Sequence, residues 1–262
     1  MDPLAVLSEG ITELQESFKS ADVFSIGPVG VTQYALWMLV IFVIVAAVVL
    51  AVSKRLSMVP GGNKFVGMVE YGYDFIRKGI AEDVIGQGYK KHIPFLATLF
   101  FFILVSNFVG LIPGCKTPTG TISITWALAL CSFVYFNYWG VKAHGGLGYL
   151  KSIAPSGLPL PLVPVVWFFE FISLCLRLLT LAVRLYGNMF AGHMVLGIFA
   201  LATSVFIGTA VQNMDMVVSL PALGWMAFLF AMYALEVLVA FLQAYVFTIL
   251  SAVYVSLATS DH

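Results

Sequence analysis

Five ionisable side chains lie within long apolar stretches of this 262-residue sequence. They are Glu170, Arg177, Arg184, His193 and Glu236. A charge in the hydrocarbon core of a membrane costs at least ~2.5 to 3.5 kcal/mol, so such groups are candidates for function. Carboxylates and an imidazole can exchange protons near neutral pH, whereas a guanidinium stays protonated. The residue types therefore predict proton transfer around a fixed positive charge.

Helical spacing arranges these groups and their polar neighbours as two stripes. One stripe follows a single helix face through these residues: Glu170, Ser173, Arg177, Thr180, Arg184 and Asn188. The other stripe runs along the last apolar stretch through Glu236, Gln243 and Tyr254. His193 points away from the first stripe. The pattern favours a polar path along two helices.

A structural alternative is that the stripes are ion pairs and hydrogen bonds that hold two helices together. Arg177 fits this alternative, since it can stretch towards Glu170 or extend to the membrane surface. Arg184 fits it poorly, because a permanent pair with Glu236 leaves the placement of His193 unexplained. We interpret Arg184 as a barrier to free proton passage and as the partner of a carboxylate that need not belong to this chain.

The overall composition places these stretches in a membrane. The chain is 61% hydrophobic and 10% charged, with 13 basic and 13 acidic residues, whereas soluble domains average about 45–50% apolar and about 25% charged. This composition excludes a nucleic-acid binder and disfavours a soluble enzyme or a disordered tail. Cys115, Cys131 and Cys175 have the spacing of neither a disulfide framework nor a metal site.

We predict an all-α integral membrane protein with about five transmembrane helices and a surface amphipathic helix over about residues 64–86. The expected spans are residues 33–52, 93–111, 121–139, 162–210 and 220–257. A short link, 114–120, makes the second and third spans a helical hairpin. At about 1.5 Å per residue the last two spans far exceed the ~30 Å core, so they must tilt strongly. Three parts follow, namely an acidic segment 1–32, three spans over 33–161, and a long helical hairpin over 162–262.

Charge in the loops predicts the orientation of the chain. Basic residues dominate loops 53–92 and 140–161, which places those loops and the C-terminus in the cytoplasm and the acidic N-terminus outside. The first 32 residues do not have the pattern of a secretory signal. An alternative breaks the fourth span at Tyr186-Gly187-Asn188, which gives six crossings and an outer C-terminus.

Two motifs resemble subunit a of F-type ATP synthases. They are the run RLYGNMFAGH from Arg184 to His193 and the run LQAYVF from Leu242 to Phe247, with weaker similarity in SNFVGLIP from Ser106 and at Pro118-Thr119. The resemblance implies a proton-conducting stator of the Fo motor, in which two offset half-channels and an arginine barrier couple proton flow to rotation of a c ring. It also implies five crossings, with the last two helices forming a tilted hairpin against that ring.

The same resemblance assigns roles to individual positions. Arg184 matches the arginine that faces the ring carboxylates. The residues that match the outer half-channel, through which protons are taken up, are Glu236, His193, Asn188 and Gln243. The residues that match the inner half-channel, through which protons are released, are Glu170 and Ser173. Secondary positions are Arg177, Thr180, Tyr254 and Asn107.

This chain departs from the best-known enterobacterial pattern of that family. The acid and the imidazole have exchanged places, since His193 follows the Ala-Gly pair and Glu236 lies on the last helix. The exchange preserves one acid and one imidazole but leaves open which of them meets water first. Gly110 stands where some relatives carry an acid, so the outer half-channel has one fewer carboxylate.

The resemblance implies the c ring, the b-subunit peripheral stalk and the rest of the F-type ATP synthase as partners, together with membrane lipid. We expect no cofactor, no metal, no nucleic acid and no enzyme activity of the chain by itself, with a proton rather than sodium as the translocated ion. The expected location is the bacterial inner membrane, with the mitochondrial inner membrane as an alternative. A stand-alone proton-coupled transporter or channel is the alternative function, although no internal repeat of the kind found in many transporters is visible. An intramembrane enzyme lacks support, because neither H-E-x-x-H nor G-x-S-x-G occurs.

Overall fold

The structure is a computed structural model that describes residues 10–12, 22–26, 29–53, 64–112, 114–146, 148–149, 161–213 and 216–260. Most of the predicted acidic segment 1–32 lies outside the described residues. The main helices are α2 (Gln33–Ser53), α3 (Lys64–Ile76), α4 (Asp83–Ile85), α5 (Ile93–Gly110), α6 (Ile122–His144), α8 (Val163–Asn213) and α9 (Met216–Thr259). Shorter elements are the strands β1 (Asp22–Ile26) and β2 (Val29–Thr32), the π-helix η1 (Arg77–Glu82) and the 3-10 turns η2 (Tyr89–Lys91) and η3 (Pro118–Gly120).

Five of these helices, α2, α5, α6, α8 and α9, are long and apolar enough to cross a membrane. They coincide with the five predicted spans to within a few residues, which confirms the predicted fold class. Each apolar run forms a helix because a helix pairs its backbone N–H and C=O groups within itself, and lipid offers these groups no other hydrogen-bond partner. Helix α8 continues without a break through Gly187, so the six-crossing alternative is wrong.

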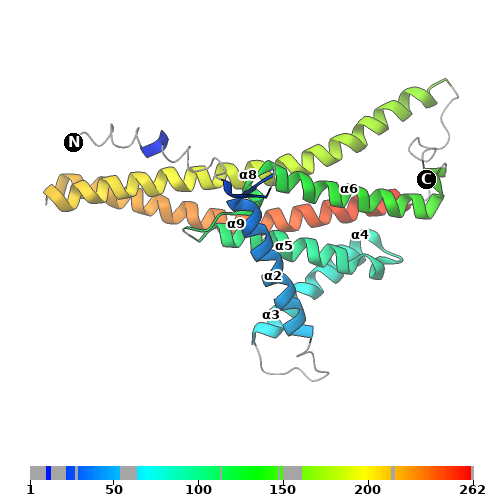
Figure 1. Cartoon of the computed structure of the whole chain (residues 1–262), viewed down its shortest axis with the longest axis horizontal. Helices are drawn as coiled ribbons and strands as arrows, with labels where there is room; N and C mark the ends of the chain where they lie inside the picture. Colours follow the sequence, from blue (N-terminus) through cyan, green and yellow to red (C-terminus); the bar gives the residue numbers. More distant parts are fainter. Residues whose placement is uncertain are drawn as a thin grey trace.

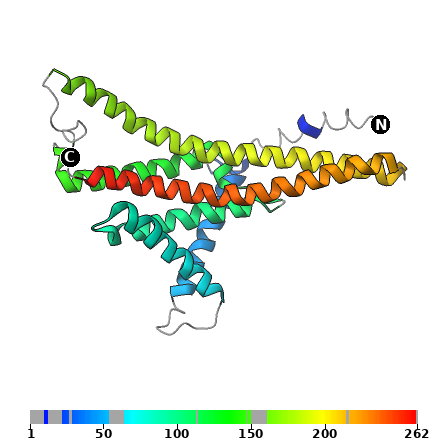
Figure 2. The same ribbon diagram turned by 180° about the vertical axis from the view of Figure 1, so that it is seen from behind.

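The long helices α8 and α9 lie side by side and set the long axis of the molecule (Figures 1 and 2). Helix α2 stands at a steep angle to this pair (Figure 1). If α2 crosses the bilayer close to the normal, the long pair is strongly inclined, as the length argument predicts. Small buried residues at the helix contacts, such as Ala182, Ala240, Ala244 and Ala252, allow the backbones to approach closely.

Helices α5 and α6 run antiparallel and are joined by a short link, as expected, but they do not form a packed hairpin. Helix α9 lies between them (Figure 1), and each of the two packs on α9. They meet through aromatic side chains at one end, where the rings of Phe95 and Tyr135 stack at a centroid distance of 3.8 Å. The expectation of a simple hairpin is therefore corrected by the insertion of α9.

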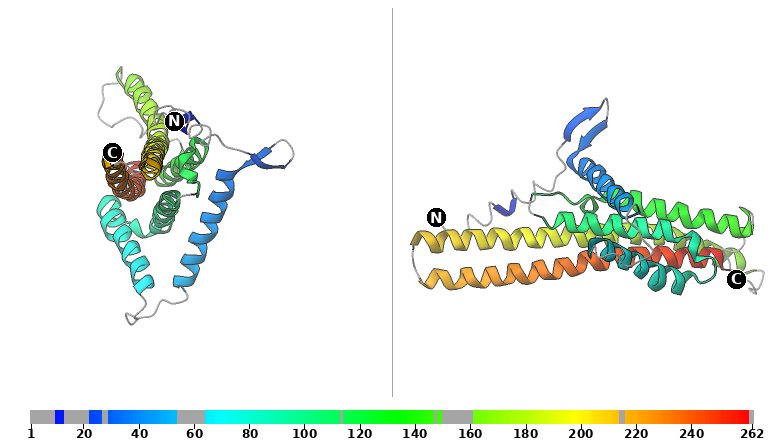
Figure 3. Two further views of the ribbon diagram at one scale, coloured as in Figure 1. Left: turned by 90° about the vertical axis from the view of Figure 1, so that its left-hand side faces the viewer. Right: turned by 90° about the horizontal axis from the view of Figure 1, so that it is seen from below.

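The predicted amphipathic helix is confirmed as a continuous helical segment formed by α3, η1 and α4. Its buried side, Val66, Ile76, Ile80 and Ala81, packs towards α5 and α9, while Tyr71 is largely exposed. The antiparallel pair β1 and β2 was not predicted; it projects beyond the start of α2 (Figure 3). The turn-forming dipeptide between the two strands in the sequence, Gly-Pro, was the available signal.

Candidate functional site

Arg184 lies near the middle of α8 and is exposed, as is Asn188 one turn further along. No described carboxylate lies within 4.0 Å of the Arg184 guanidinium, and the ion pairs among the described residues join only Asp74 with Arg77 and Lys78. Exposed apolar side chains occupy the same stretch of α8 and the neighbouring part of α9: Leu176, Leu179, Val183, Leu235, Leu238, Phe241 and Leu242. The internal pair between Arg184 and Glu236 is therefore not formed, and Arg184 presents a charge on an apolar surface.

Glu236 is on α9 and only 2% exposed. Its carboxyl group lies directly on the backbone of Gly192 in α8, because a Cβ atom added at Gly192 would collide with all three atoms of that group. The oxygen Oε1 of Glu236 is buried and has no hydrogen-bond partner in the described structure. Only glycine at position 192 permits this contact, which sets Glu236 against α8 at the residue before His193.

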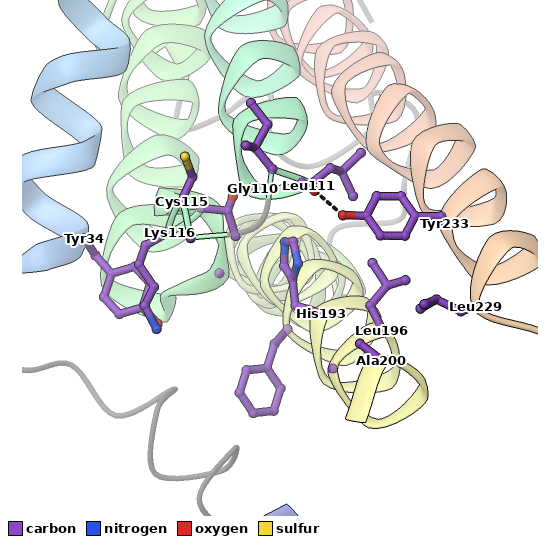
Figure 4. A pocket seen from close by; sticks show the side chains of 16 residues that line it. Tyr34, Gly110, Leu111, Cys115, Lys116, His193, Leu196, Ala200, Leu229 and Tyr233 are labelled. Atoms are coloured by element: carbon purple, nitrogen blue, oxygen red, sulfur yellow. Dashed lines mark hydrogen bonds between the residues drawn. The ribbon is translucent and has the colours of Figure 1, made fainter. Parts of the chain in front are cut away.

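The imidazole of His193 points from α8 towards the end of α5 (Figure 4). A Cβ atom added at Gly110 would lie 3.0 Å from its Nε2 atom and would collide with Thr117. Within the described residues Nε2 has no hydrogen-bond partner. The imidazole thus occupies the space beside position 110, where a larger side chain has no room.

A cavity of about 440 Å³ lies beside His193. It is bounded by the end of α5, the link that follows, α8 and α9, and its lining includes Lys116, Leu196, Ala200 and Tyr233 (Figure 4). The hydroxyl of Tyr233 donates to the carbonyl of Leu111 and joins α9 to the end of α5. The volume admits several water molecules at about 30 Å³ each. Glu236 lies about one helical turn beyond Tyr233 on α9 and is not among the residues that line the cavity.

Asn107 belongs to a buried network that fixes α5 against α9. Its Nδ2 donates to the carbonyl of Ala240 at 3.1 Å, and its Oδ1 accepts from the hydroxyl of Thr119 at 2.7 Å. Thr117 in turn donates to the carbonyl of Ser106 at 3.0 Å. Asn107, predicted as a secondary site residue, therefore makes internal contacts. Sequence reasoning missed Thr117 and Tyr233, for which helical spacing carries no signal.

The residues predicted for the inner half-channel lie apart from this cluster. Glu170 and Ser173 are half-exposed near the start of α8. Arg177 does not pair with Glu170 within 4.0 Å in the described structure; its guanidinium carbon lies 5.4 Å from the ring centroid of Tyr254 on α9. Such a cation–π contact stabilises the charged guanidinium and leaves its positive charge in place.

Two further predicted positions, Thr180 and Gln243, make no contact in the described structure that defines a role in proton transfer. The hydroxyl of Thr180 donates to the carbonyl of Leu176 in its own helix at 2.8 Å. Gln243 is half-buried on α9, two turns from Glu236. Ser251, further along that helix, donates to the carbonyl of Phe247 and accepts from Ser132 of α6 at 2.8 Å. Across the described ranges, no three His, Cys, Asp or Glu side chains converge as metal ligands would.

The chain is similar in sequence to a known protein family. A family model described as ATP synthase A chain matches residues 35–256. ATP synthase subunit a of Nocardioides sp. is 39% identical over 235 residues, which cover 88% of this chain and 83% of the relative. The subunit a of Rhodobacter capsulatus is 39% identical over 227 residues (85% and 90%), and that of Bradyrhizobium diazoefficiens is 37% identical over 250 residues (91% and 94%).

Proposed function

Because this chain belongs to the ATP synthase A chain family, we propose that it is the proton-conducting stator subunit of the Fo motor. It is an integral membrane subunit of a bacterial ATP synthase, and in this proposal it is not an enzyme by itself. Two offset half-channels and the arginine barrier of Arg184 couple proton flow to rotation of the c ring. The b-subunit stalk holds the chain stationary.

The exposure of Arg184 is the observation that carries this proposal. A guanidinium on the apolar surface of a membrane helix is costly unless an anion meets it, and the described residues supply none within 4.0 Å. A carboxylate on a moving partner fits this requirement. When protonated it is neutral and can face lipid, and when ionised it must face Arg184 or water.

The cavity beside His193 supports a proton-uptake half-channel on one side of Arg184. Water in the cavity can deliver a proton to the imidazole, and Glu236, which lies against the neighbouring Gly192, can relay it towards the ring, because both groups exchange protons. In the part of the chain that the structure describes, the buried atoms Nε2 of His193 and Oε1 of Glu236 have no hydrogen-bond partner, so both can take part in proton transfer. Asn188 and Gln243 line the approach to Arg184.

Glu170 and Ser173 form the proposed release side. Along the helix, Glu170 lies about 21 Å and His193 about 13 Å from Arg184, in opposite directions. Uptake and release groups therefore lie on opposite sides of the barrier. Secondary positions on the release side are Arg177, Thr180 and Tyr254. A transmembrane potential contributes about 2.3 kcal/mol per charge per 100 mV and gives the motor its direction.

The proposed orientation places the N-terminus outside and the C-terminus in the cytoplasm, with protons as the coupling ion. A cysteine introduced as His262→Cys should react only with a reagent added on the cytoplasmic side. Reaction from the outer side contradicts the orientation. ATP synthesis that requires sodium at constant proton gradient contradicts the choice of ion.

The decisive experiment compares Arg184→Ala with Arg177→Ala in the complete ATP synthase, in inverted membrane vesicles. We expect Arg184→Ala to abolish ATP synthesis, while Arg177→Ala retains most of it, since Arg177 rests on the ring of Tyr254. Immunoblots of the assembled complex control for the amount of the chain. Undiminished synthesis in Arg184→Ala contradicts the barrier, and equal losses in both variants indicate that the arginines only join helices.

A further inference from the structure

Two lysines converge on one tryptophan where α5 begins and α6 ends. The Nζ atom of Lys142 lies 4.7 Å from the ring centroid of Trp139, and that of Lys91 lies 5.7 Å from the same ring. Lys142 also lies 5.9 Å from the ring of Tyr138. The first lysine comes from α6 and the second from the residues just before α5, so tertiary structure assembles this cluster.

The cluster offers positive charge that the protein leaves uncompensated. In the described part of the chain, neither ammonium group has a carboxylate within 4.0 Å, and both lysines are exposed. The two like charges lie about one Debye length apart or closer, ~10 Å at 0.1 M ionic strength, so they repel. An anion between them removes that repulsion.

The tryptophan that carries the lysines rests on a rigid base. His92 is buried, and its ring meets that of Trp139 edge-on at 4.8 Å. The Nδ1 atom of His92 lies 3.0 Å from the hydroxyl of Tyr135, whose ring stacks on Phe95. The indole ring is therefore held in place, and binding an anion beside it requires ordering only the two lysine side chains.

The position of the cluster indicates the kind of anion. It lies where α5 begins and α6 ends, two helices long and apolar enough to cross a membrane, at the side of the molecule that also carries α4 and the end of α9 (Figures 1 and 2). Tryptophan and tyrosine at such ends lie at the depth of the lipid headgroups. Basic groups between helix ends on the cytoplasmic side bind anionic headgroups.

We propose that Lys91, Lys142 and Trp139 form a binding site for the phosphate headgroup of an anionic phospholipid. The two ammonium groups contact the phosphate oxygens, and the indole lies against the glycerol and upper acyl region. A zwitterionic lipid carries its own ammonium group and loses the advantage of the second lysine. The site requires only that α5 and α6 span the membrane, so it stands or fails independently of the proton path.

The test uses the complete ATP synthase in nanodiscs of phosphatidylcholine with a small fraction of a photoreactive phosphatidylglycerol. Mass spectrometry locates the adducts. We expect adducts on the peptides that contain residues 89–92 and 138–142, reduced at least about tenfold in the double variant Lys91→Gln/Lys142→Gln. The matched control, Lys64→Gln/Lys78→Gln on the surface helix, removes the same charge and should leave them unchanged.

Three results overturn the proposal. Equal labelling by a photoreactive phosphatidylcholine shows that the site does not select anionic lipid. Unchanged labelling in the double variant shows that the lysines do not hold the headgroup. Competition by millimolar inorganic phosphate or glycerol phosphate shows a site for free anions instead. Trp139→Phe keeps an aromatic ring and should cause a smaller loss than the double variant, and the amount of assembled chain is measured for every variant.

Discussion

The two polar regions on either side of Arg184 are built differently. On the side of the proposed uptake half-channel, Glu236 and Asn107 are 2% and 0% exposed, and they contact α8 and α9 within this chain. On the side of the proposed release half-channel, Glu170 and Ser173 are half-exposed. The start of α8 diverges there from α6 and α9 (Figure 2). Glu236 and Asn107 of the proposed uptake region are thus enclosed by this chain, whereas the proposed release residues lie in an open region of it.

The largest effect in this comparison is expected for Glu236→Gln. The amide cannot relay a proton, and buried surroundings give water little access to replace it, so ATP-driven proton pumping should fall by about a hundredfold. Quenching of a pH-sensitive dye in inverted vesicles measures this. The control is Glu82→Gln, an exposed carboxyl on the surface helix. Full pumping by Glu236→Gln would mean that the enclosed carboxyl carries no protons.

A somewhat smaller loss is expected for Gly192→Ala. The added Cβ has no room beside the carboxyl group of Glu236, and a displacement of about 1 Å can cost up to about a hundredfold in rate. We expect about a tenfold loss of pumping. Gly208→Ala is the matched control, because nothing lies within 4 Å of its added Cβ. Equal pumping by the two variants would show that the close contact between Gly192 and Glu236 is not needed for proton uptake.

The open region around Glu170 should tolerate substitution better. Glu170→Gln is expected to lower pumping only about threefold, because water can reach a half-exposed position and supply the missing hydrogen bonds. The same dye assay compares it with Glu236→Gln. A loss as large as that of Glu236→Gln would show that the release region is also sealed in the assembled complex, and would end the contrast between the two regions.

The smallest effect concerns His92, which lies outside both regions. Burial, helped by the positive charge of Lys91, lowers the pKa of His92 below its ordinary value. As the pH falls, His92 therefore takes up a proton in the unfolded chain before it does so in the folded chain. The free energy of unfolding should decrease as the pH falls below about 6.5. Thermal unfolding of the complex between pH 5 and 8 measures the slope. His92→Gln should flatten it, and an unchanged slope would assign the pH dependence to other groups.

Much of this architecture follows from the amino-acid sequence because lipid imposes simple rules. The five spans and the surface helix were predicted from apolar length and amphipathic spacing, and the helix bounds confirm them. The family was predicted from two motifs, and the family model confirms it. The roles of Arg184, His193 and Glu236 remain predictions, supported by their placement. The alternative pairing of Arg177 with Glu170 was wrong, since Arg177 lies on Tyr254 instead.

What helical spacing left open was decided by contacts between distant segments. Apolar length puts a helix into lipid, but lipid is as apolar as leucine and does not choose that helix's neighbours. Close packing of small residues and buried hydrogen bonds make that choice. They place α9 between α5 and α6, set Glu236 on Gly192 and leave Arg184 on the surface. The charges that are expensive in a membrane can thus be read from the sequence, whereas only the packing shows which are enclosed and which lie on the surface of the chain.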